Sequence, residues 1–299
     1  MMSDKLKGGI YVALGASSYG MLTTCVKMAY HEGFNVAEIT VSQYVLGALG
    51  LLILNLFRKN KSMILSNRPS GKTALQLVAA GASLGLTSLF YYLAVQYVSV
   101  GVGIVLLMQS VWIGIIAEMI IHKKMPGSKT LLAVLVILCG TVLAASIGQK
   151  GIRVNWIGIG WGLLAAVSYT ATMYSSNSVG IHFPPLKRSL YMILGGLIII
   201  LSIFHAHLNQ DFSFRIFVRW GIVLSLFGTI LPPILLTKGM PLTGMGLGAI
   251  IVSLEIPVSV LMAFVLINER VSGTQWLGVV LILLAVVLMN VGKRPSVPV

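Results

Sequence analysis

The chain has 299 residues, of which 57% are hydrophobic and only 9% are charged. Soluble domains carry about 25% charged residues, so this composition excludes an ordinary soluble protein and indicates one that crosses a lipid bilayer several times. The formal net charge of +14 could suit nucleic acid, but in a membrane protein it is typical of basic cytoplasmic loops, and we expect no nucleic-acid partner.

Ten apolar segments of near-spanning length follow one another, and their connections are too short for a soluble domain. A helix needs about 20 mostly apolar residues to cross a bilayer. The first segment has that length and no obvious cleavage site, so we interpret it as a membrane helix and not as a signal peptide. The segment 189–204 is the weakest because it is short. The expected spans are 8–29, 38–57, 74–95, 99–121, 130–148, 156–177, 189–204, 220–237, 244–267 and 274–291.

The distribution of Lys and Arg predicts the orientation. With the N-terminus inside, fifteen of the 21 basic residues fall in inside loops and five in outside loops. Cytoplasmic loops carry the excess of Lys and Arg, so both termini are expected in the cytoplasm. Together with the short loops, this favours a multi-pass protein of a bacterial cell inner membrane.

The two halves of the sequence resemble each other. A shift of 150 residues places Ser18 and Tyr19 on Ser168 and Tyr169. Further along, a shift of 146 residues places Gln109 on Glu255. We therefore predict an internal duplication.

The duplication predicts the fold class. Residues 1–149 would form the first five-helix repeat and residues 150–299 the second. Because five spans is an odd number, the repeats would insert in opposite orientations. The prediction is an all-α membrane protein with ten transmembrane helices, built as two inverted five-helix repeats around a central cavity. In such folds the substrate site lies between the repeats near the bilayer midplane.

Glu255 and Pro257 lie in the middle of the apolar span 244–267. A carboxylate at the bilayer centre costs about 2.5 kcal/mol or more, so it normally faces a protein or water interior. The proline has no N–H to donate and leaves the carbonyl of Ser253 free. Irregular backbone beside a buried charge is typical of a solute pathway through a membrane.

The segment LEIPVSVLMAFVLINERVSGTQWLGVVLIL, with the ten spans and the duplication, resembles the EamA-type transporters of the drug/metabolite transporter superfamily. The resemblance implies ten helices around a cavity that opens alternately to each side. Relatives move amino acids, cysteine metabolites, sugars or purines. The first half departs from the family pattern, since Tyr19, Val111 and Lys123 stand where tryptophan, proline and glutamate are usual.

Three residues are the first candidates for binding a substrate. Glu255 would bind an amine or a proton, or would act as a structural hydrogen-bond acceptor. Gln109 can donate and accept, which suits a zwitterion, but it could equally tie two helices together. Trp112 shares a helix face with Gln109 at a spacing of three residues, and simple packing is its alternative.

Five further polar residues are weaker candidates. Tyr91 and Tyr92 are separated by about 100° around a helix, so we do not expect both to face the cavity squarely, and an interfacial aromatic belt is the alternative. Gln43 and Tyr174 also lie within apolar spans. Lys27 would attract a substrate carboxylate, or would extend to the membrane surface.

Pro232 and Pro233 in the eighth expected span, with Pro257 in the ninth, are candidate gating or hinge positions, static bends being the alternative. We expect no metal and no cofactor. The two cysteines lie within apolar spans, the histidines lie in loops or at span ends, and no catalytic or ATP-binding signature is present. The sequence therefore favours a transporter over an enzyme or a primary pump.

The favoured function is a secondary transporter that exports small polar metabolites, with amino acids preferred, by alternating access through a midplane cavity. The alternative is a flippase or efflux carrier for amphiphilic or drug-like compounds. The expected partners are a small-molecule substrate, the lipid bilayer and, if Glu255 titrates, protons. The protein would be a monomer or a loose dimer.

Overall fold

The computed structural model describes residues 3–57, 71–98, 100–123, 125–144, 155–209, 212–268 and 271–291. All regular secondary structure in these ranges is helical. The α-helices are α1 (Asp4–His31), α2 (Val36–Phe57), α3 (Gly71–Tyr97), α4 (Val100–Leu107), α5 (Ser110–His122), α6 (Ser128–Ala144), α7 (Trp156–Ser178), α8 (Pro185–Phe204), α9 (Ile222–Ser225), α10 (Leu231–Thr243), α11 (Met245–Val252), α12 (Glu255–Ile267) and α13 (Gly273–Val291). A 3-10 helix covers His205–Asn209, and π-helical segments Phe217–Gly221 and Leu226–Ile230 flank α9.

The all-α membrane architecture is confirmed. Each expected span falls on a helix, and within the described ranges eight helical stretches are long and apolar enough to cross a membrane. The expected spans 130–148 and 274–291 fall on α6 and α13, which are apolar but shorter than the other spans. The count of ten membrane-crossing helices therefore stays a prediction.

Short polar and proline signals set where several helices begin. Asn35 and Glu38 form a reciprocal cap at the start of α2: the Glu38 N–H donates to Asn35 Oδ1 (3.0 Å) and the Asn35 N–H donates to Glu38 Oε2 (2.8 Å). Pro185 is the first residue of α8, a position where a missing N–H costs nothing. Because this helix has 20 residues, the prediction of a short seventh span was wrong.

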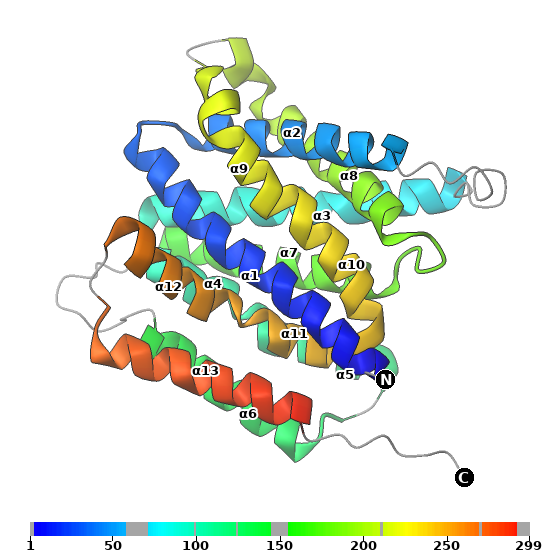
Figure 1. The fold of residues 1–299 in the computed structure, drawn as a ribbon, viewed down its shortest axis with the longest axis vertical. Coiled ribbons are helices and arrows are strands. Elements are labelled where there is room, and N and C mark those ends of the chain that lie inside the picture. The colour runs from blue at the N-terminus through cyan, green and yellow to red at the C-terminus, as the bar shows by residue number, and fades with distance from the viewer. Residues whose placement is uncertain are drawn as a thin grey trace.

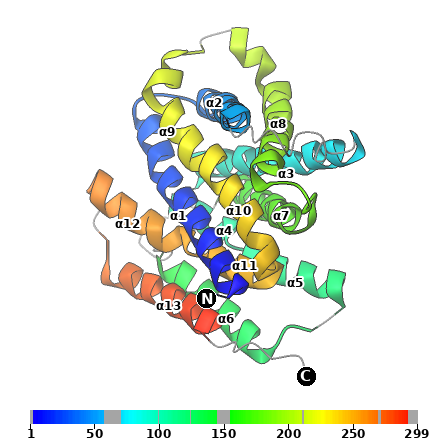
Figure 2. The same ribbon diagram turned by 45° about the vertical axis from the view of Figure 1, so that its right-hand side comes forward.

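The helices pack in pairs drawn from both halves of the sequence. α1 lies along α10 and against α12, α3 packs on α7 and α8, and α6 lies beside α13 at the lower edge of the molecule in Figures 1 and 2. Two matching serines donate to backbone carbonyls of the other half, Ser18 to the π-helical segment directly before α10 and Ser168 to α3. Ser18 Oγ donates to the Phe227 carbonyl (3.0 Å), and Ser168 Oγ donates to the Ser83 carbonyl (2.8 Å).

Two spans are broken in their middle, and the breaks correspond. The span 102–122 is interrupted at Met108 and Gln109, between α4 and α5. The span 245–267 is interrupted at Ser253 and Leu254, between α11 and α12. The ends of α4 and α5 coincide with those of α11 and α12 after a shift of 145 residues.

This register corrects the sequence comparison, which used a shift of 146 residues. The counterpart of Glu255 is Ser110, since each is the first residue of the second half-helix. Gln109 corresponds to Leu254 instead. The same shift relates Lys123 and Asn268, which both end their helices in the left-handed conformation, with φ of 50° and 54°.

Candidate functional site

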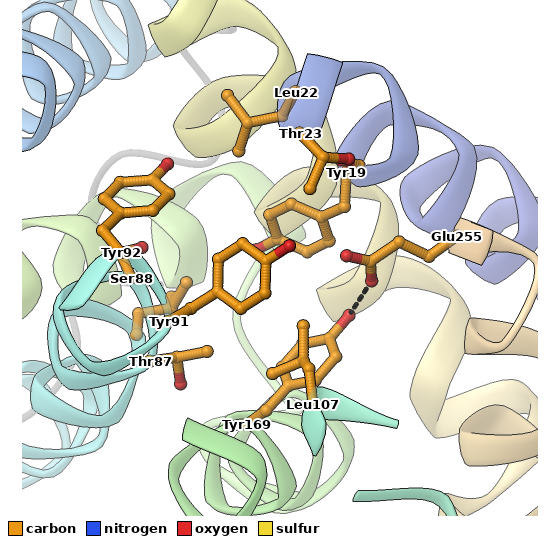
Figure 3. Close-up of a pocket in the computed structure, with 11 residues that line it drawn as sticks. Tyr19, Leu22, Thr23, Thr87, Ser88, Tyr91, Tyr92, Leu107, Tyr169 and Glu255 are labelled. Carbon is orange, nitrogen blue, oxygen red and sulfur yellow. Dashed lines mark hydrogen bonds between the residues drawn. The ribbon is translucent and has the colours of Figure 1, made fainter. Parts of the chain in front are cut away.

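A pocket of about 480 Å³, a volume that includes its open mouth, lies where five helices meet. Figure 3 shows its lining. The wall contains one carboxylate, four tyrosines, three leucines and three small hydroxyl residues. They are Tyr19, Leu22 and Thr23 of α1, Leu84, Thr87, Ser88, Tyr91 and Tyr92 of α3, Leu107 of α4, Tyr169 of α7 and Glu255 of α12.

Glu255 lies at the break in its span, as the first residue of α12. Its side chain is only 4% exposed and accepts a hydrogen bond from Tyr169 Oη (3.4 Å; Figure 3). The positive end of the helix dipole at this position stabilises a negative charge. Pro257 follows in the first turn, where no intrahelical donor is needed. The sequence thus places a carboxylate at an interrupted helix facing a pocket.

α1 positions the other side of the site through one close approach. A Cβ added to Gly20 would lie 2.6 Å from the carbonyl oxygen of Glu255, so only glycine lets the two helices meet at this point. One turn further on, Thr23 Oγ1 donates to Ser259 Oγ (3.1 Å) and joins the same helices. α1 therefore holds Tyr19 beside the carboxylate.

The tyrosine rings are arranged in two contacting pairs. Tyr19 and Tyr169 pack edge to face, with ring centroids 6.0 Å apart and an interplanar angle of 84°. Tyr91 and Tyr92 lie 6.1 Å apart at 59°. The hydroxyl of Tyr92 donates to Gln43 Oε1 (2.8 Å). The hydroxyl of Tyr91 is buried and has no hydrogen-bond partner in the described part of the chain.

Several predicted residues meet at this pocket. Glu255, Tyr91 and Tyr92 line it, and Gln43 supports Tyr92 from behind. The expectation that the two tyrosines would not both face the cavity squarely agrees with their hydroxyl groups, since that of Tyr92 bonds to Gln43 whereas that of Tyr91 points into the pocket (Figure 3). The lining residues of α3 stand at i, i+3, i+4, i+7 and i+8, so the pocket follows a broad stripe of this helix and both rings fit on it.

Other predicted residues lie elsewhere. Gln109 turns back onto its own helix, where Nε2 donates to the Val105 carbonyl (2.9 Å) and Oε1 accepts from Trp112 Nε1 (2.8 Å). Trp112 is 38% exposed and Tyr174 is 39% exposed, and neither lines the pocket. Lys27 is half-buried on α1, two turns beyond Tyr19, and is also absent from the lining. A role for these four in substrate binding stays a prediction.

The prolines coincide with helix irregularities. Pro232 and Pro233 stand in the first turn of α10, directly after the π-helical segment Leu226–Ile230. Two consecutive residues without an N–H remove regular helical hydrogen bonds, which accounts for the irregular turn there. Pro257 follows the break between α11 and α12. These positions fit hinges, and their movement stays a prediction.

Sequence reasoning missed the tyrosine pair at the centre of the site. Tyr19 and Tyr169 were matched by the shift of 150 residues, but neither was named as a candidate site residue. In a duplicated fold, equivalent residues near the axis that relates the halves can meet. The spacing of Tyr19, Leu22 and Thr23, at i, i+3 and i+4, was a second signal for a shared face.

Comparisons with known proteins agree with this fold. The profile of the EamA-like transporter family matches residues 6–146 and again 156–291. A protein of Salmonella typhimurium (strain LT2), described as the uncharacterized inner membrane transporter YicL, is 25% identical over 303 aligned positions, covering 98% of each chain. A solved crystal structure superposes with a TM-score of 0.76 at 13% identity, over 98% of this chain and 100% of that chain, and shares its fold.

Proposed function

Since the chain belongs to the EamA-like transporter family, we propose that it is a secondary transporter that exports small polar metabolites bearing an amino group. Amino acids are the class that the sequence analysis favours. The observation that carries the proposal is the buried carboxylate of Glu255, placed at a helix break and facing a pocket together with four tyrosines. A carboxylate in that position can hold a protonated amine.

The proposal includes ten membrane helices arranged as two inverted repeats, 1–149 and 150–299. The corresponding breaks of α4–α5 and α11–α12 and the matching bonds of Ser18 and Ser168 support it. The pocket would open alternately to each side as the halves rock about the Tyr19–Tyr169 contact. Pro232, Pro233 and Pro257 would act as hinges. The transporter would lie in a bacterial inner membrane with both termini in the cytoplasm, as a monomer or loose dimer.

The test is uptake of a labelled amino acid panel into proteoliposomes, at two pH values, by the wild type and by Glu255→Gln. Glu32→Gln is the matched control, because Glu32 is exposed and lies beyond the end of α1. Saturable uptake that Glu255→Gln abolishes and Glu32→Gln preserves would support the proposal. A change in the pH dependence of uptake in Glu255→Gln would add coupling to protons. Uptake that survives in Glu255→Gln would contradict a binding role for Glu255.

A second candidate is an efflux carrier or flippase for amphiphilic compounds. It is favoured by the apolar part of the wall, where Leu22, Leu84 and Leu107 line the pocket. The same liposomes distinguish it. Transport of lipid-like or drug-like compounds, with no transport of any amino acid, would replace the first proposal by the second.

A further inference from the structure

We propose that the cargo binds as an organic cation, with its charged nitrogen held between Glu255 and the surrounding tyrosines, and that the pocket disfavours molecules carrying a carboxylate beside that nitrogen. This rests on the proposed function, since it names the class of substrate for the same pocket. Within the proposed class of metabolites bearing an amino group, it replaces amino acids by amines without a carboxylate as the expected cargo.

The charge of the wall is the first argument. Among the eleven described residues of the wall, Glu255 is the single carboxylic acid and none is Lys, Arg or His. A carboxylate buried in a membrane protein needs a partner of opposite charge or strong hydrogen bonds. Within the described residues, its side chain accepts one hydrogen bond, the long contact from Tyr169 (3.4 Å). A cationic ligand would supply the missing opposite charge.

The tyrosine rings are the second argument. Figure 3 shows Tyr19, Tyr91 and Tyr169 directed toward the same space as the carboxylate. The face of an aromatic ring carries negative charge density and attracts ammonium groups, more strongly where water is excluded. Three rings around one carboxylate therefore match the chemistry of an amine, from a primary ammonium to a quaternary one.

An unpaired hydroxyl is the third argument. Tyr91 is 6% exposed, and its Oη has no partner in the described residues although it points into the pocket (Figure 3). A buried polar group without a hydrogen bond is costly, so such a group inside a binding pocket indicates a ligand atom. The oxygen of Tyr91 can accept from an N–H of the cargo.

A carboxylate on the cargo would find little compensation. It would approach the charge of Glu255 and meet only hydroxyl donors. The buried guanidinium of Arg188 already donates to four backbone carbonyls, those of Val179 (2.9 Å), Thr237 (2.7 Å), Ser176 (2.7 Å) and Ser175 (3.4 Å). Lys238 lies over the ring of Tyr11, 3.9 Å from its centroid.

The ends of the broken helices do not replace a basic side chain. Helix N-termini can hold anions. The N-terminus of α12, however, is occupied by Glu255 itself, and Ser110, which begins α5, is absent from the lining. The described wall of the pocket therefore favours a positive group and offers a negative one neither a basic side chain nor an open helix N-terminus.

The experiment compares ligands that share one body and differ in charge. Phenethylamine, its N,N,N-trimethyl derivative, 2-phenylethanol, phenylalanine and 3-phenylpropanoate would be titrated into purified wild-type protein in detergent at pH 7, with calorimetric detection. The two cations are expected to bind about tenfold or more tightly than the alcohol, the zwitterion and the anion. This comparison needs no variant, so misfolding cannot obscure it.

Variants then assign the contacts. Glu255→Gln should weaken binding of both cations by about tenfold or more and leave 2-phenylethanol within about twofold. Tyr91→Leu should weaken binding of the trimethyl cation more than Tyr91→Phe does, because phenylalanine keeps the ring face. Tyr97→Leu, at an exposed tyrosine of α3 outside the pocket, is the matched control and should bind as the wild type does.

The outcomes separate this inference from the proposed function. If phenylalanine binds as tightly as phenethylamine or more tightly, and Glu255→Gln abolishes its transport, the transporter proposal stands and the cation inference falls. If no ligand of any charge binds or is transported by protein that is monodisperse and melts cooperatively, both fall. If Tyr91→Phe and Tyr91→Leu lose the same affinity for the trimethyl cation, the proposed contact between the cation and the ring of Tyr91 is contradicted.

Discussion

Gly20 offers a test of how the close approach of two helices sets the position of the carboxylate. In Gly20→Ala, the new methyl carbon would lie 2.6 Å from the Glu255 carbonyl oxygen, 2.9 Å from Val258 Cβ and 3.1 Å from the Ser259 nitrogen. Ordinary contact begins at 3.4 Å. α12 must therefore move by about 0.8 Å, since two of the three obstacles are backbone atoms that cannot rotate away.

That displacement has two measurable consequences. Overpacking of this kind costs about 1–3 kcal/mol, which would lower the thermal midpoint of the purified protein. Misplacing a binding group by about 1 Å can cost about a hundredfold in rate, so we expect transport to fall between tenfold and a hundredfold. The assay is initial uptake into proteoliposomes, normalised to the amount of folded protein.

Gly160→Ala is the matched control, because nothing lies within 4 Å of a Cβ added there. Alanine is favoured over glycine inside a helix by about 0.5–1 kcal/mol, so this variant should be as stable as the wild type or more so and should transport normally. If Gly20→Ala transports and melts like Gly160→Ala, the contact between α1 and α12 does not set the geometry of the site and the reasoning fails.

Three further outcomes follow from single contacts. Arg188→Met keeps the aliphatic stem but removes three hydrogen bonds of 2.9 Å or less. At about 1 kcal/mol net for each bond, the folded protein should lose about 3 kcal/mol of stability, measured by thermal unfolding. An unchanged thermal midpoint would show that the bonds contribute nothing net. The hydrogen bond from Arg219 holds the pKa of the exposed Glu32 carboxyl below its ordinary value. The pair therefore stabilises the protein at pH values above the ordinary pKa, and this contribution disappears as pH falls through the lowered pKa. The thermal midpoints of the wild type and Glu32→Gln should converge in acid, and divergence would contradict this. Trp112→Phe should transport within about twofold of the wild type, because Gln109 is the one hydrogen-bond partner of the indole in the described part of the chain. A tenfold loss would place Trp112 on the pathway.

The sequence predicts the architecture well because the membrane imposes simple rules on it. The length of the apolar segments locates the helices, and the cost of burying a carboxylate in a bilayer singles out Glu255 as a candidate site residue. Tyr91 and Tyr92 were identified as candidates, with the expectation that their separation on the helix keeps both from facing the cavity squarely. The stripe from Leu84 to Tyr92 shows how both can still line one pocket, because a wall wider than one residue admits both neighbours.

Gln109 shows the limit of aligning two halves of one chain by eye. The shift of 146 residues aligned Gln109 with Glu255 and made it look like the polar equivalent of that residue. The helix boundaries place Ser110 at that position, and Gln109 is directed away by its bonds to Val105 and Trp112. An error of one residue rotates a helical position by about 100°, which is enough to move a side chain from the pocket to another face.

The correct register also shows how the two halves divide the work at the site. Both contribute a tyrosine, and Tyr19 and Tyr169 meet edge to face at the centre. Both contribute a broken helix, but the second half begins α12 with a carboxylate, whereas the first begins α5 with Ser110, whose buried hydroxyl has no partner in the described residues. Ser110 is absent from the pocket lining, so the one carboxylate of the described wall comes from the second half alone. On the proposed alternating-access mechanism, one monovalent cation would neutralise that carboxylate in either orientation of the halves, and the same contact would be kept while the mouth changes sides.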